Sequence, residues 1–333
     1  MSEYSFSEIG VEESIELLYE GTPFKAHSPS SFSPAKGSTV ETGSLMFLEG
    51  VDFDLVYFPL KHLGHKCVTA ATSHLYSRLS SPRSLDISLG ISSKLDFKEV
   101  KDLWDGIVAA AKEYGYKSVS LNLAPSKNGL SIGIGYTGEK KAETAFSEAQ
   151  SKDLLCVSGS LGAAYLGMRV LENGKQEFEK SGKEPDLKNY KMIIGSYLKP
   201  ELSPYILSTI EDSGITPSSG VVVEHGLADA CMRISRSTGL GIKVYADRIP
   251  FEGNSFSLGK EIDIDPISAA MNGGNDYRVL FTVPIMQMEK VRHDLQTFDI
   301  IGHLAQKEVG CVLVSPEGVE FPMKAQGWKN NEE

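Results

Sequence analysis

The sequence predicts an α+β protein with two domains, residues 1–150 and 151–333. Three features of the pattern support this prediction. A strand–helix–strand–strand series spans residues 84–138, a second series of short apolar strands and helices begins at residue 154, and the polar stretch Glu139–Asp153 separates them. The chain has 333 residues, of which 41% are hydrophobic and 23% charged, so it has the size and ordinary composition of two globular cores.

The first domain opens with an amphipathic segment and a long polar connection. In chain order we expect a helix at Val11–Glu20, a loop at Gly21–Ser44, a strand at Leu45–Leu60 that ends in a turn near Pro59, a helix at Leu63–Leu79, and a strand with period two at Ser84–Ile91. Asp52 and Asp54 alternate with apolar residues, so we expect them on the solvent face of the Leu45–Leu60 strand.

The clearest helix is Phe97–Tyr114. Asp96 is the expected N-cap, Glu99 stands three residues later as in a capping box, and Gly115 marks the end. Trp104 lies on the apolar face of this helix and is expected in the core. The domain is completed by strands at Lys117–Leu123 and Gly129–Gly138 around a turn at Pro125–Asn128.

The second domain alternates short apolar runs with helical segments. The expected elements are a strand at Leu154–Ser158, a helix from the Gly159–Gly162 turn to about Leu171, an exposed insertion at Glu172–Lys188, helices at Leu187–Tyr197, Ser203–Ser213 and Leu227–Thr238, and strands at Val221–Val223, Gly241–Tyr245, Tyr277–Val283, Cys311–Val314 and Val319–Phe321.

The segment Asn272–Pro284 joins a tight turn, polar side chains and a strand within thirteen residues. Gly273 and Gly274 are expected to allow positive φ and a close backbone approach, and Asn275 and Asp276 supply two acceptors. Taken alone, this pattern is most often a simple turn before a strand.

Charge and cysteine usage narrow the class of protein. The net charge is −11 and the pI about 5.2, which argues against broad electrostatic binding to nucleic acid or anionic membranes. The cysteines Cys67, Cys156, Cys231 and Cys311 are far apart and show no metal-ligand spacing, so we expect reduced core residues. The first eight residues do not resemble a signal peptide, and no run is long and apolar enough for a membrane span. The expected location is the cytoplasm.

Several stretches, in this order and spacing, resemble the thiamine-monophosphate kinases, which belong to a superfamily that includes aminoimidazole ribonucleotide synthetase. The stretches are Leu48–Leu55, Pro59–Gly64, Val157–Tyr165, Asn272–Phe281, Ile301–His303 and Lys324–Trp328.

The resemblance implies a homodimer in which each chain has two synthetase-like α+β domains. In the family, the N-terminal domain carries dimerisation and the nucleotide and metal side, and the reaction is ATP-dependent, Mg²⁺-dependent phosphorylation of thiamine monophosphate to the diphosphate. Carried onto this sequence, the resemblance implies substrate binding by Asp52, Asp276 and Trp328, and cofactor binding by Gly159, Gly162 and Gly226.

Most aspartates of the family motifs are replaced in this chain. Phosphoryl transfer between two polyanions depends on charge neutralisation by Mg²⁺, and Mg²⁺ prefers carboxylate and phosphate oxygens. The family's Gly-Asp-Asp-Ala has no counterpart, since Ser31–Thr42 contains no aspartate. The other degenerate family positions are Leu45, His74, Asn122, Ser160 and His225, and in the Asn-Gly-Gly-Glu-Asp-Tyr-Glu motif the two glutamates are replaced by Asn275 and Arg278.

These substitutions predict a kinase-like protein whose catalysis is lost or much reduced, without a metal site and with ATP and Mg²⁺ binding weak or absent. The alternative is a working kinase with a rebuilt site in which the metals bind Glu49, Asp52, Asp229 and Asp276. A metal site can lose one ligand to water, although even a change in the residues around the ligands lowers metal affinity or activity about 10–100-fold. Neutral drift of this kind cannot explain the replacement of six family positions at once.

A third hypothesis is a binding or regulatory module that keeps thiamine or thiamine phosphate as ligand without transferring phosphate. Trp328 would then stack on a flat ring, or it simply packs the C-terminal segment onto the core. His74 and His225 could also form a transition-metal site with Glu224 or Asp229, although satisfied histidines are the simpler interpretation.

Overall fold

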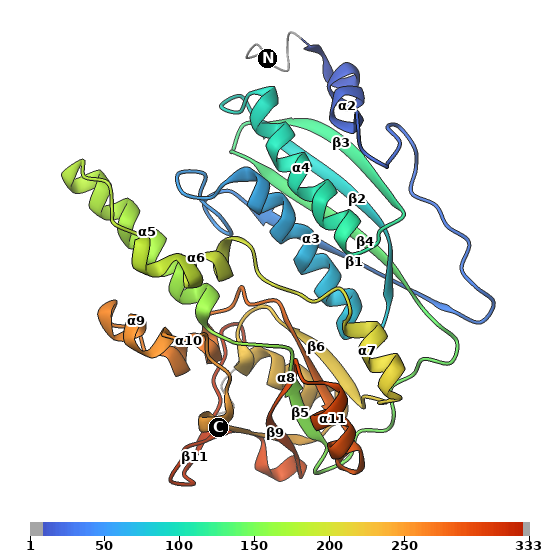
Figure 1. Ribbon diagram of the computed structural model, residues 1–333, viewed down its shortest axis with the longest axis vertical. Coiled ribbons are helices and arrows are strands. Elements are labelled where there is room, and N and C mark those ends of the chain that lie inside the picture. The colour runs from blue at the N-terminus through green and yellow to red at the C-terminus, as the bar shows by residue number, and fades with distance from the viewer. Residues whose placement is uncertain (1–8, 329–333) are drawn as a thin grey trace. The chain divides into compact units, whose positions relative to one another are not determined.

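The structure is a computed structural model that describes residues 9–328. The prediction about Met1–Glu8 lies outside the described residues. The chain divides into two compact units, one made of Met1–Leu75 and Leu79–Thr144, the other of Tyr76–Arg78 and Ala145–Glu333. The fold is mixed helix and sheet with one sheet in each unit, as expected of an α+β protein (Figure 1).

The first unit is built on a four-stranded sheet of order β1-β4-β2-β3. Its strands are β1 (Thr39–Leu48), β2 (Ser81–Ser92), β3 (Ser118–Ser126) and β4 (Ser131–Lys140). β4 runs antiparallel to β1 and β2, whereas β2 and β3 are parallel and are joined through a helix, as a parallel pair requires. The helices are α2 (Val11–Tyr19), α3 (Leu60–Ser77) and α4 (Phe97–Glu113).

Two glycines let α3 and α4 approach closely. A Cβ added at Gly64 would lie 2.1 Å from the carbonyl oxygen of Leu103, and one added at Gly106 would lie 2.0 Å from that of Lys61. Any larger residue would therefore force the helices apart. The expected capping box of α4 is present: Asp96 accepts from the Glu99 amide at 2.7 Å, and Glu99 accepts from the Asp96 amide at 2.8 Å.

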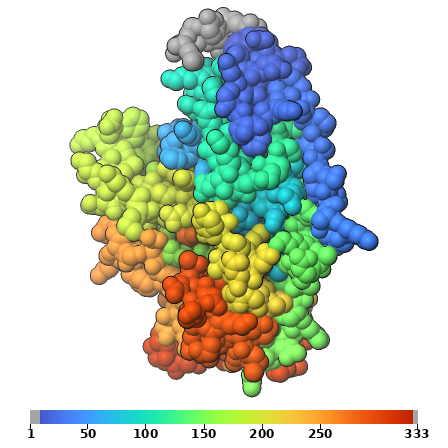
Figure 2. Space-filling view, turned by 45° about the vertical axis from the view of Figure 1, so that its right-hand side comes forward, coloured from blue at the N-terminus to red at the C-terminus, as the bar shows by residue number. Residues whose placement is uncertain are grey.

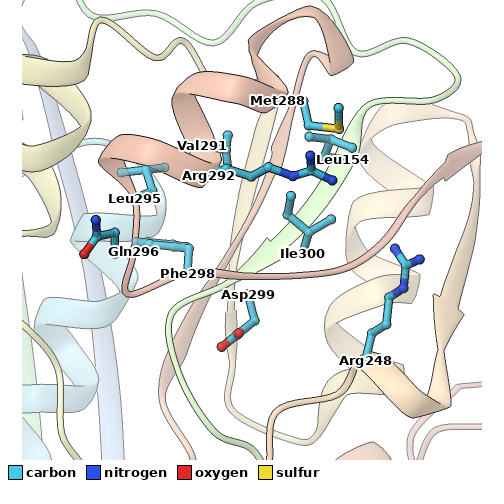
Figure 3. A pocket seen from close by; sticks show the side chains of 10 residues that line it. All are labelled: Leu154, Arg248, Met288, Val291, Arg292, Leu295, Gln296, Phe298, Asp299 and Ile300. Carbon is cyan, nitrogen blue, oxygen red and sulfur yellow. The ribbon is translucent and has the colours of Figure 1, made fainter.

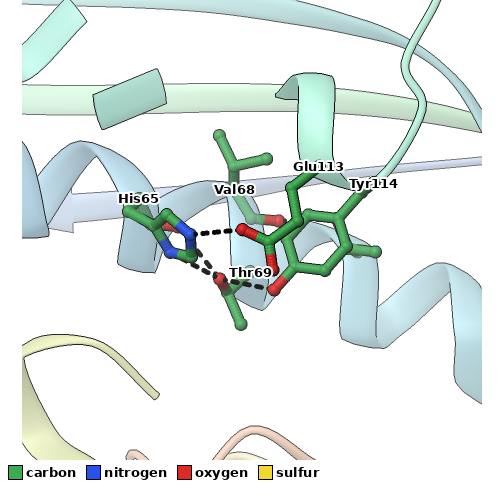
Figure 4. A network of polar contacts seen from close by, with 6 residues as sticks. His65, Val68, Thr69, Glu113 and Tyr114 are labelled. Atoms are coloured by element: carbon green, nitrogen blue, oxygen red, sulfur yellow. Dashed lines mark hydrogen bonds and ion pairs between the residues drawn. The ribbon is translucent and has the colours of Figure 1, made fainter. Parts of the chain in front are cut away.

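A polar network links the same two helices beside the glycine contact (Figure 4). His65 Nε2 lies 3.0 Å from Glu113 Oε2, and His65 Nδ1 lies 3.2 Å from the Thr69 hydroxyl. The Thr69 hydroxyl is also 3.1 Å from the Tyr114 hydroxyl. Because His65 and Thr69 are buried, these contacts satisfy polar groups that would otherwise destabilise the packing.

The second unit is built on a seven-stranded sheet of order β11-β10-β7-β9-β5-β8-β6. Its strands are β5 (Leu154–Val157), β6 (Ser219–Val223), β7 (Gly241–Tyr245), β8 (Arg278–Val283), β9 (Asp299–Ala305), β10 (Cys311–Val314) and β11 (Glu320–Pro322). The α-helices are α5 (Ala163–Ser181), α6 (Lys191–Leu198), α7 (Ile206–Ser213), α8 (Leu227–Thr238), α9 (Ser255–Glu261), α10 (Pro266–Asn272) and α11 (Met288–Asp294).

Only β7 and β10 pair in parallel among the named neighbours of this sheet, and α8 packs on β6, β7 and β10. The core of the unit lies between them, with Leu227, Cys231 and Ile234 of α8 fully buried against the strands. α7 and α11 lie side by side on the surface of this unit (Figure 2).

Several predicted elements need correction. β1 begins at Thr39, inside the predicted loop Gly21–Ser44, and ends at Leu48, so the predicted strand to Leu60 is wrong beyond that point. α5 continues to Ser181 through the first part of the predicted insertion. The helices α9, α10 and α11 and the central strand β9 were not expected. None of the helices within residues 9–328 combines the length and apolar composition needed to cross a bilayer.

Candidate functional site

The candidate site of the second unit is the loop Ser158–Gly162, between the end of β5 and the start of α5. Gly159 has φ of 122° and Gly162, the residue before α5, has φ of 79°, conformations that side chains disfavour. A Cβ added at Gly162 would lie 2.8 Å from the amide nitrogen of Ala270. Glycine here therefore allows α10 to contact the N-terminus of α5.

The Asn272–Pro284 motif leads from α10 into β8 beside this loop. Gly274 has the expected positive φ of 78°, but Gly273 is right-handed, with φ of −77°. The expected positive φ at Gly273 is thus wrong. The expected close approach of its backbone to a neighbour is confirmed, because a Cβ added at Gly273 would lie 2.4 Å from Tyr165 Cβ. Asn275 and Tyr277 adopt positive φ of 67° and 49°, a strained conformation for non-glycine residues.

Backbone hydrogen bonds hold this strained turn against the last residue of β6 and the residue after it. The Asn275 amide donates to the Glu224 carbonyl at 2.8 Å, and the Tyr277 amide donates to the Val223 carbonyl at 2.9 Å. Tyr277 therefore precedes β8 and does not belong to it, which corrects the predicted strand start.

Asp276 binds the start of α5. Its carboxyl group is buried, and Oδ2 accepts from the Gly162 amide at 3.0 Å. A carboxylate is favourable at this position because amide groups and the helix dipole give the N-terminus a partial positive charge. Asp276 thus supplies the helix with an internal anion.

Arg278 lies on the other side of the same loop. A Cβ added at Gly159 would be 3.1 Å from Arg278 Cζ, so the guanidinium group covers this glycine. Nε donates to the Ser160 carbonyl at 3.3 Å, and a terminal nitrogen donates to the Glu201 carbonyl. A positive charge therefore stands where the family motif implies a glutamate.

The serines of the loop also bind protein groups. The Ser160 hydroxyl donates to Glu252 Oε2 at 2.8 Å, and the Ser158 hydroxyl accepts from the Val279 amide at 2.9 Å. Sequence reasoning did not identify Glu252 or Glu201, because no local motif marks them and Glu252 is 92 positions from Ser160.

A second glycine loop, which contains Gly226 and precedes α8, also contacts the Asn272–Pro284 motif. Gly226 has φ of 96°, and its added Cβ would lie 2.4 Å from the Met271 carbonyl oxygen. A Cβ added at Gly274 would lie 3.2 Å from His225 Cα. The structure thus brings the expected residues Gly162, Gly226 and Asp276 together around one motif.

His225 faces solvent, with 64% of its side chain exposed, and its Nε2 lies 3.8 Å from Glu224 Oε2. Asp229 is buried under the C-terminal segment: Oδ1 accepts from Trp328 Nε1 at 2.8 Å, and Oδ2 lies 2.9 Å from Arg233 Nε. Arg236 covers a face of the Trp328 ring at 4.0 Å. Trp328 thus packs on α8, and its role in stacking on a ligand stays a prediction.

The remaining expected residues lie in the first unit. Leu45 pairs with Ile134 across β1 and β4, Asn122 is exposed on β3, and the His74 ring stacks on Tyr136 at 5.9 Å. Asp52 accepts from the Leu48 amide at 2.8 Å. Asp52 lies in the turn after β1 and Asp54 directly precedes the next turn, which corrects their expected place on a strand.

The donor set of the Ser158–Gly162 loop does not fit Mg²⁺. Asp276 and Glu252 hold a backbone amide and a hydroxyl, and the guanidinium of Arg278 repels a cation at this position. Over residues 9–328, no cluster of three or more histidine, cysteine, aspartate or glutamate side chains is arranged to hold a metal ion.

Solved structures show which known fold the chain has. The thiamine-monophosphate kinase of Stenotrophomonas maltophilia K279a matches with a TM-score of 0.73 at 19% identity, covering 94% of this chain and 96% of that one. AaThiL complexed with AMPPCP and TMP matches at 0.72 and 21%, covering 95% and 98%. HypE of E. coli, a hydrogenase maturation protein, matches at 0.70 and 16%, covering 93% and 95%. The chain has the fold of aminoimidazole ribonucleotide synthetase-like proteins.

Several curated proteins are similar in sequence to most of the chain. A thiamine-monophosphate kinase of Pyrococcus horikoshii is 27% identical over 270 residues, 80% of this chain and 78% of that protein. One of Aquifex aeolicus is 24% identical over 236 residues, 71% and 73%. A putative hydrogenase expression/formation protein of Methanocaldococcus jannaschii is 23% identical over 282 residues, 80% and 78%. No family model matches the sequence. The chain is thus similar over most of its length to thiamine-monophosphate kinases and to a hydrogenase maturation protein, which share the synthetase-like fold.

Proposed function

We propose that this protein is a thiamine-monophosphate kinase-like protein in which ATP-dependent phosphoryl transfer is lost or much reduced. The observation that carries the proposal is the position of Arg278, whose guanidinium covers Gly159 and binds the Ser160 carbonyl. Several relatives are named as thiamine-monophosphate kinases, and the structure of AaThiL contains AMPPCP and TMP, which supports the kinase reaction as the one to test.

The chemistry of the reaction makes this arrangement unfavourable for catalysis. Phosphoryl transfer to a phosphate acceptor is accelerated mainly by positioning and by Mg²⁺. The two carboxylates at the loop, Asp276 and Glu252, already accept from a backbone amide and a hydroxyl, and the guanidinium of Arg278 covers Gly159. The replaced positions Leu45, His74, Asn122 and His225 offer no carboxylate.

A working kinase with a rebuilt site is the alternative. Its four candidate ligands already have protein partners: the Leu130 amide for Glu49, the Leu48 amide for Asp52, the indole of Trp328 for Asp229 and the Gly162 amide for Asp276. Metal binding would have to compete with these hydrogen bonds, which favours our main proposal.

Calorimetry with AMPPCP distinguishes a protein with lost catalysis from a working kinase with a rebuilt site. The proposal expects less than about tenfold tightening of AMPPCP binding when Mg²⁺ replaces EDTA, because few carboxylates are free to hold the metal. Tightening well beyond tenfold would favour the rebuilt kinase.

A second candidate function is metal-independent binding of thiamine phosphate, which the positive charge of Arg278 beside the N-terminus of α5 favours. Thiamine-monophosphate binding in EDTA should weaken about tenfold in Arg278→Gln. The matched control is Arg169→Gln, which changes an exposed arginine of α5 paired only locally with Glu172. Equal binding by wild type and Arg278→Gln rules this candidate out.

We further propose a cytoplasmic homodimer. The cysteines Cys67, Cys156, Cys231 and Cys311 are all free thiols, which supports a reducing compartment. Val40, Met46 and Leu48 form an exposed apolar row on one face of the edge strand β1, which supports a second copy of the chain as the partner of this face.

A further inference from the structure

The second unit contains a cavity of about 600 Å³ at the end of β5 away from the Ser158–Gly162 loop (Figure 3). Leu154, which lines the cavity, is the first residue of β5, whereas the loop follows the last residue of that strand. The cavity shares no lining residue with the loop. It is formed by the 3₁₀ turn at Ala246–Arg248, by α11 and by the connection from α11 into β9.

Five apolar side chains form one part of the cavity lining. Leu154, Val291, Leu295 and Phe298 are all buried in the unit, and Ile300 of β9 completes the surface. A volume of about 600 Å³ falls within the range of pockets that hold small organic molecules. An apolar floor of this kind favours a flat ring over a free inorganic ion.

Two arginines from different elements stand at the rim. Figure 3 shows the guanidinium groups of Arg248 and Arg292 on two sides of Ile300. The Arg248 guanidinium lies 5.0 Å from the Tyr245 ring, which holds it in place. Arg292 lies 3.5 Å from Glu289, but this pair is exposed and therefore screened, so Arg292 can exchange it for a ligand.

Gln296 and Asp299 are the other polar residues of the lining. Partial burial raises the pKa of the Asp299 carboxyl, so the cavity wall disfavours its negative charge. The lining itself carries two guanidinium groups and one carboxyl, and the Glu289 carboxylate beside Arg292 is exposed to solvent and screened.

We propose that this cavity is a second ligand site, which binds a phosphorylated flat ring with the phosphate at Arg248 and Arg292 and the ring on Ile300 and Phe298. A phosphate monoester carries about −1.5 to −2 charges at neutral pH and matches two arginine forks, which bind its oxygens in pairs. This second site does not depend on the function proposed for the Ser158–Gly162 loop.

The test is calorimetry of the full chain with 2-naphthyl phosphate and with 2-naphthol as separate probes. We expect one equivalent of 2-naphthyl phosphate to bind, and 2-naphthol to bind at least about tenfold more weakly because it lacks the phosphate. Arg248→Gln and Arg292→Gln should each weaken 2-naphthyl phosphate binding about tenfold. Both side chains are exposed, so neither change threatens folding.

Arg169→Gln, at an arginine of α5 outside the cavity, is the control and should bind 2-naphthyl phosphate as the wild type does. The proposal is overturned by any of three results: no binding up to on the order of 1 mM, equal binding of 2-naphthol, or unchanged affinity in both cavity variants.

Discussion

Arg278 ties β8 to the loop ahead of α5 through hydrogen bonds to two backbone carbonyls, those of Ser160 and Glu201. Asp276, two positions earlier, ties the same loop through the Gly162 amide. Neighbouring residues of one motif thus supply the loop with a cation and an anion from within the protein.

If Arg278 stabilises the loop in this way, Arg278→Gln should lower the free energy of unfolding by about 1–3 kcal/mol, because two carbonyls lose charged donors. Urea unfolding of wild type and variant measures the difference. Arg169→Gln should change it by less than about 0.5 kcal/mol, since its exposed ion pair contributes little. If Arg278→Gln lowers the free energy of unfolding no more than Arg169→Gln does, Arg278 does not stabilise the loop.

Glu139 is a buried carboxylate that ties an N-terminal loop to β4. Its pKa is lowered by the Ala35 amide, which donates at 2.6 Å, by the Ser38 hydroxyl, and by Arg83, whose Nε donates at 2.8 Å. A depressed pKa means that Glu139 stabilises the folded state above the pKa of the unfolded chain, and that this contribution is lost as pH falls through the folded-state pKa.

We therefore expect Glu139→Gln to destabilise the protein at neutral pH. The difference in stability between the variant and the wild type should shrink as the pH falls below about 4, which is just under the ordinary glutamate pKa. Urea midpoints of both proteins at neutral and acidic pH give the measurement. A difference that is constant across this range would show that the carboxylate charge is not responsible.

At the level of elements, the crossing of α3 and α4 depends on Gly64 and Gly106. Gly106→Ala should destabilise the first unit by about 1–3 kcal/mol or more, because the new Cβ would overlap the Lys61 carbonyl at 2.0 Å. Thermal unfolding of the variant tests this expectation.

Gly195→Ala in α6 is the matched control. Its Cβ would meet no atom within 4 Å, and its φ is not positive. Alanine should therefore be neutral there or stabilise by up to about 1 kcal/mol. Equal destabilisation by both substitutions would contradict the packing argument.

The sequence predicts elements well where local rules decide them and poorly where the tertiary structure does. The capping box of α4 and the glycine after α8 set those helix ends. β1 was missed in part because its first six residues, Thr39–Ser44, are mostly polar and include Gly43, so they show no apolar alternation. β9 was missed because Gly302 interrupts its pattern, although glycine is required there: an added Cβ would lie 2.0 Å from the Lys243 carbonyl oxygen.

The candidate site was predictable only in part for a similar reason. The glycines and Asp276 were found because they stand in motifs. The partners Glu252 and Glu201 were not, since only the fold places them beside Ser160 and Arg278. Spacing in the sequence likewise could not reveal that Asp229 is covered by Trp328.

For the whole molecule, the apolar row of β1 gives a prediction about assembly. Met46 is 68% exposed and lies on the same face of the strand as Val40 and Leu48. Met46→Lys should turn the proposed homodimer into a monomer, because burying an ammonium group at an interface is costly. Light scattering with size-exclusion chromatography measures the mass. Lys94→Met, at an exposed lysine, is the control, and an unchanged dimer in Met46→Lys would place the interface elsewhere.

The central claim is that the family fold persists here while phosphoryl transfer has been lost or much reduced. The most direct measurement is the steady-state conversion of thiamine monophosphate to thiamine diphosphate by the full chain with Mg-ATP, beside the Pyrococcus horikoshii kinase as a positive control. We predict turnover far below about 1 s⁻¹, the lower end of ordinary enzyme rates. Turnover of about 1 s⁻¹ or faster would contradict the claim.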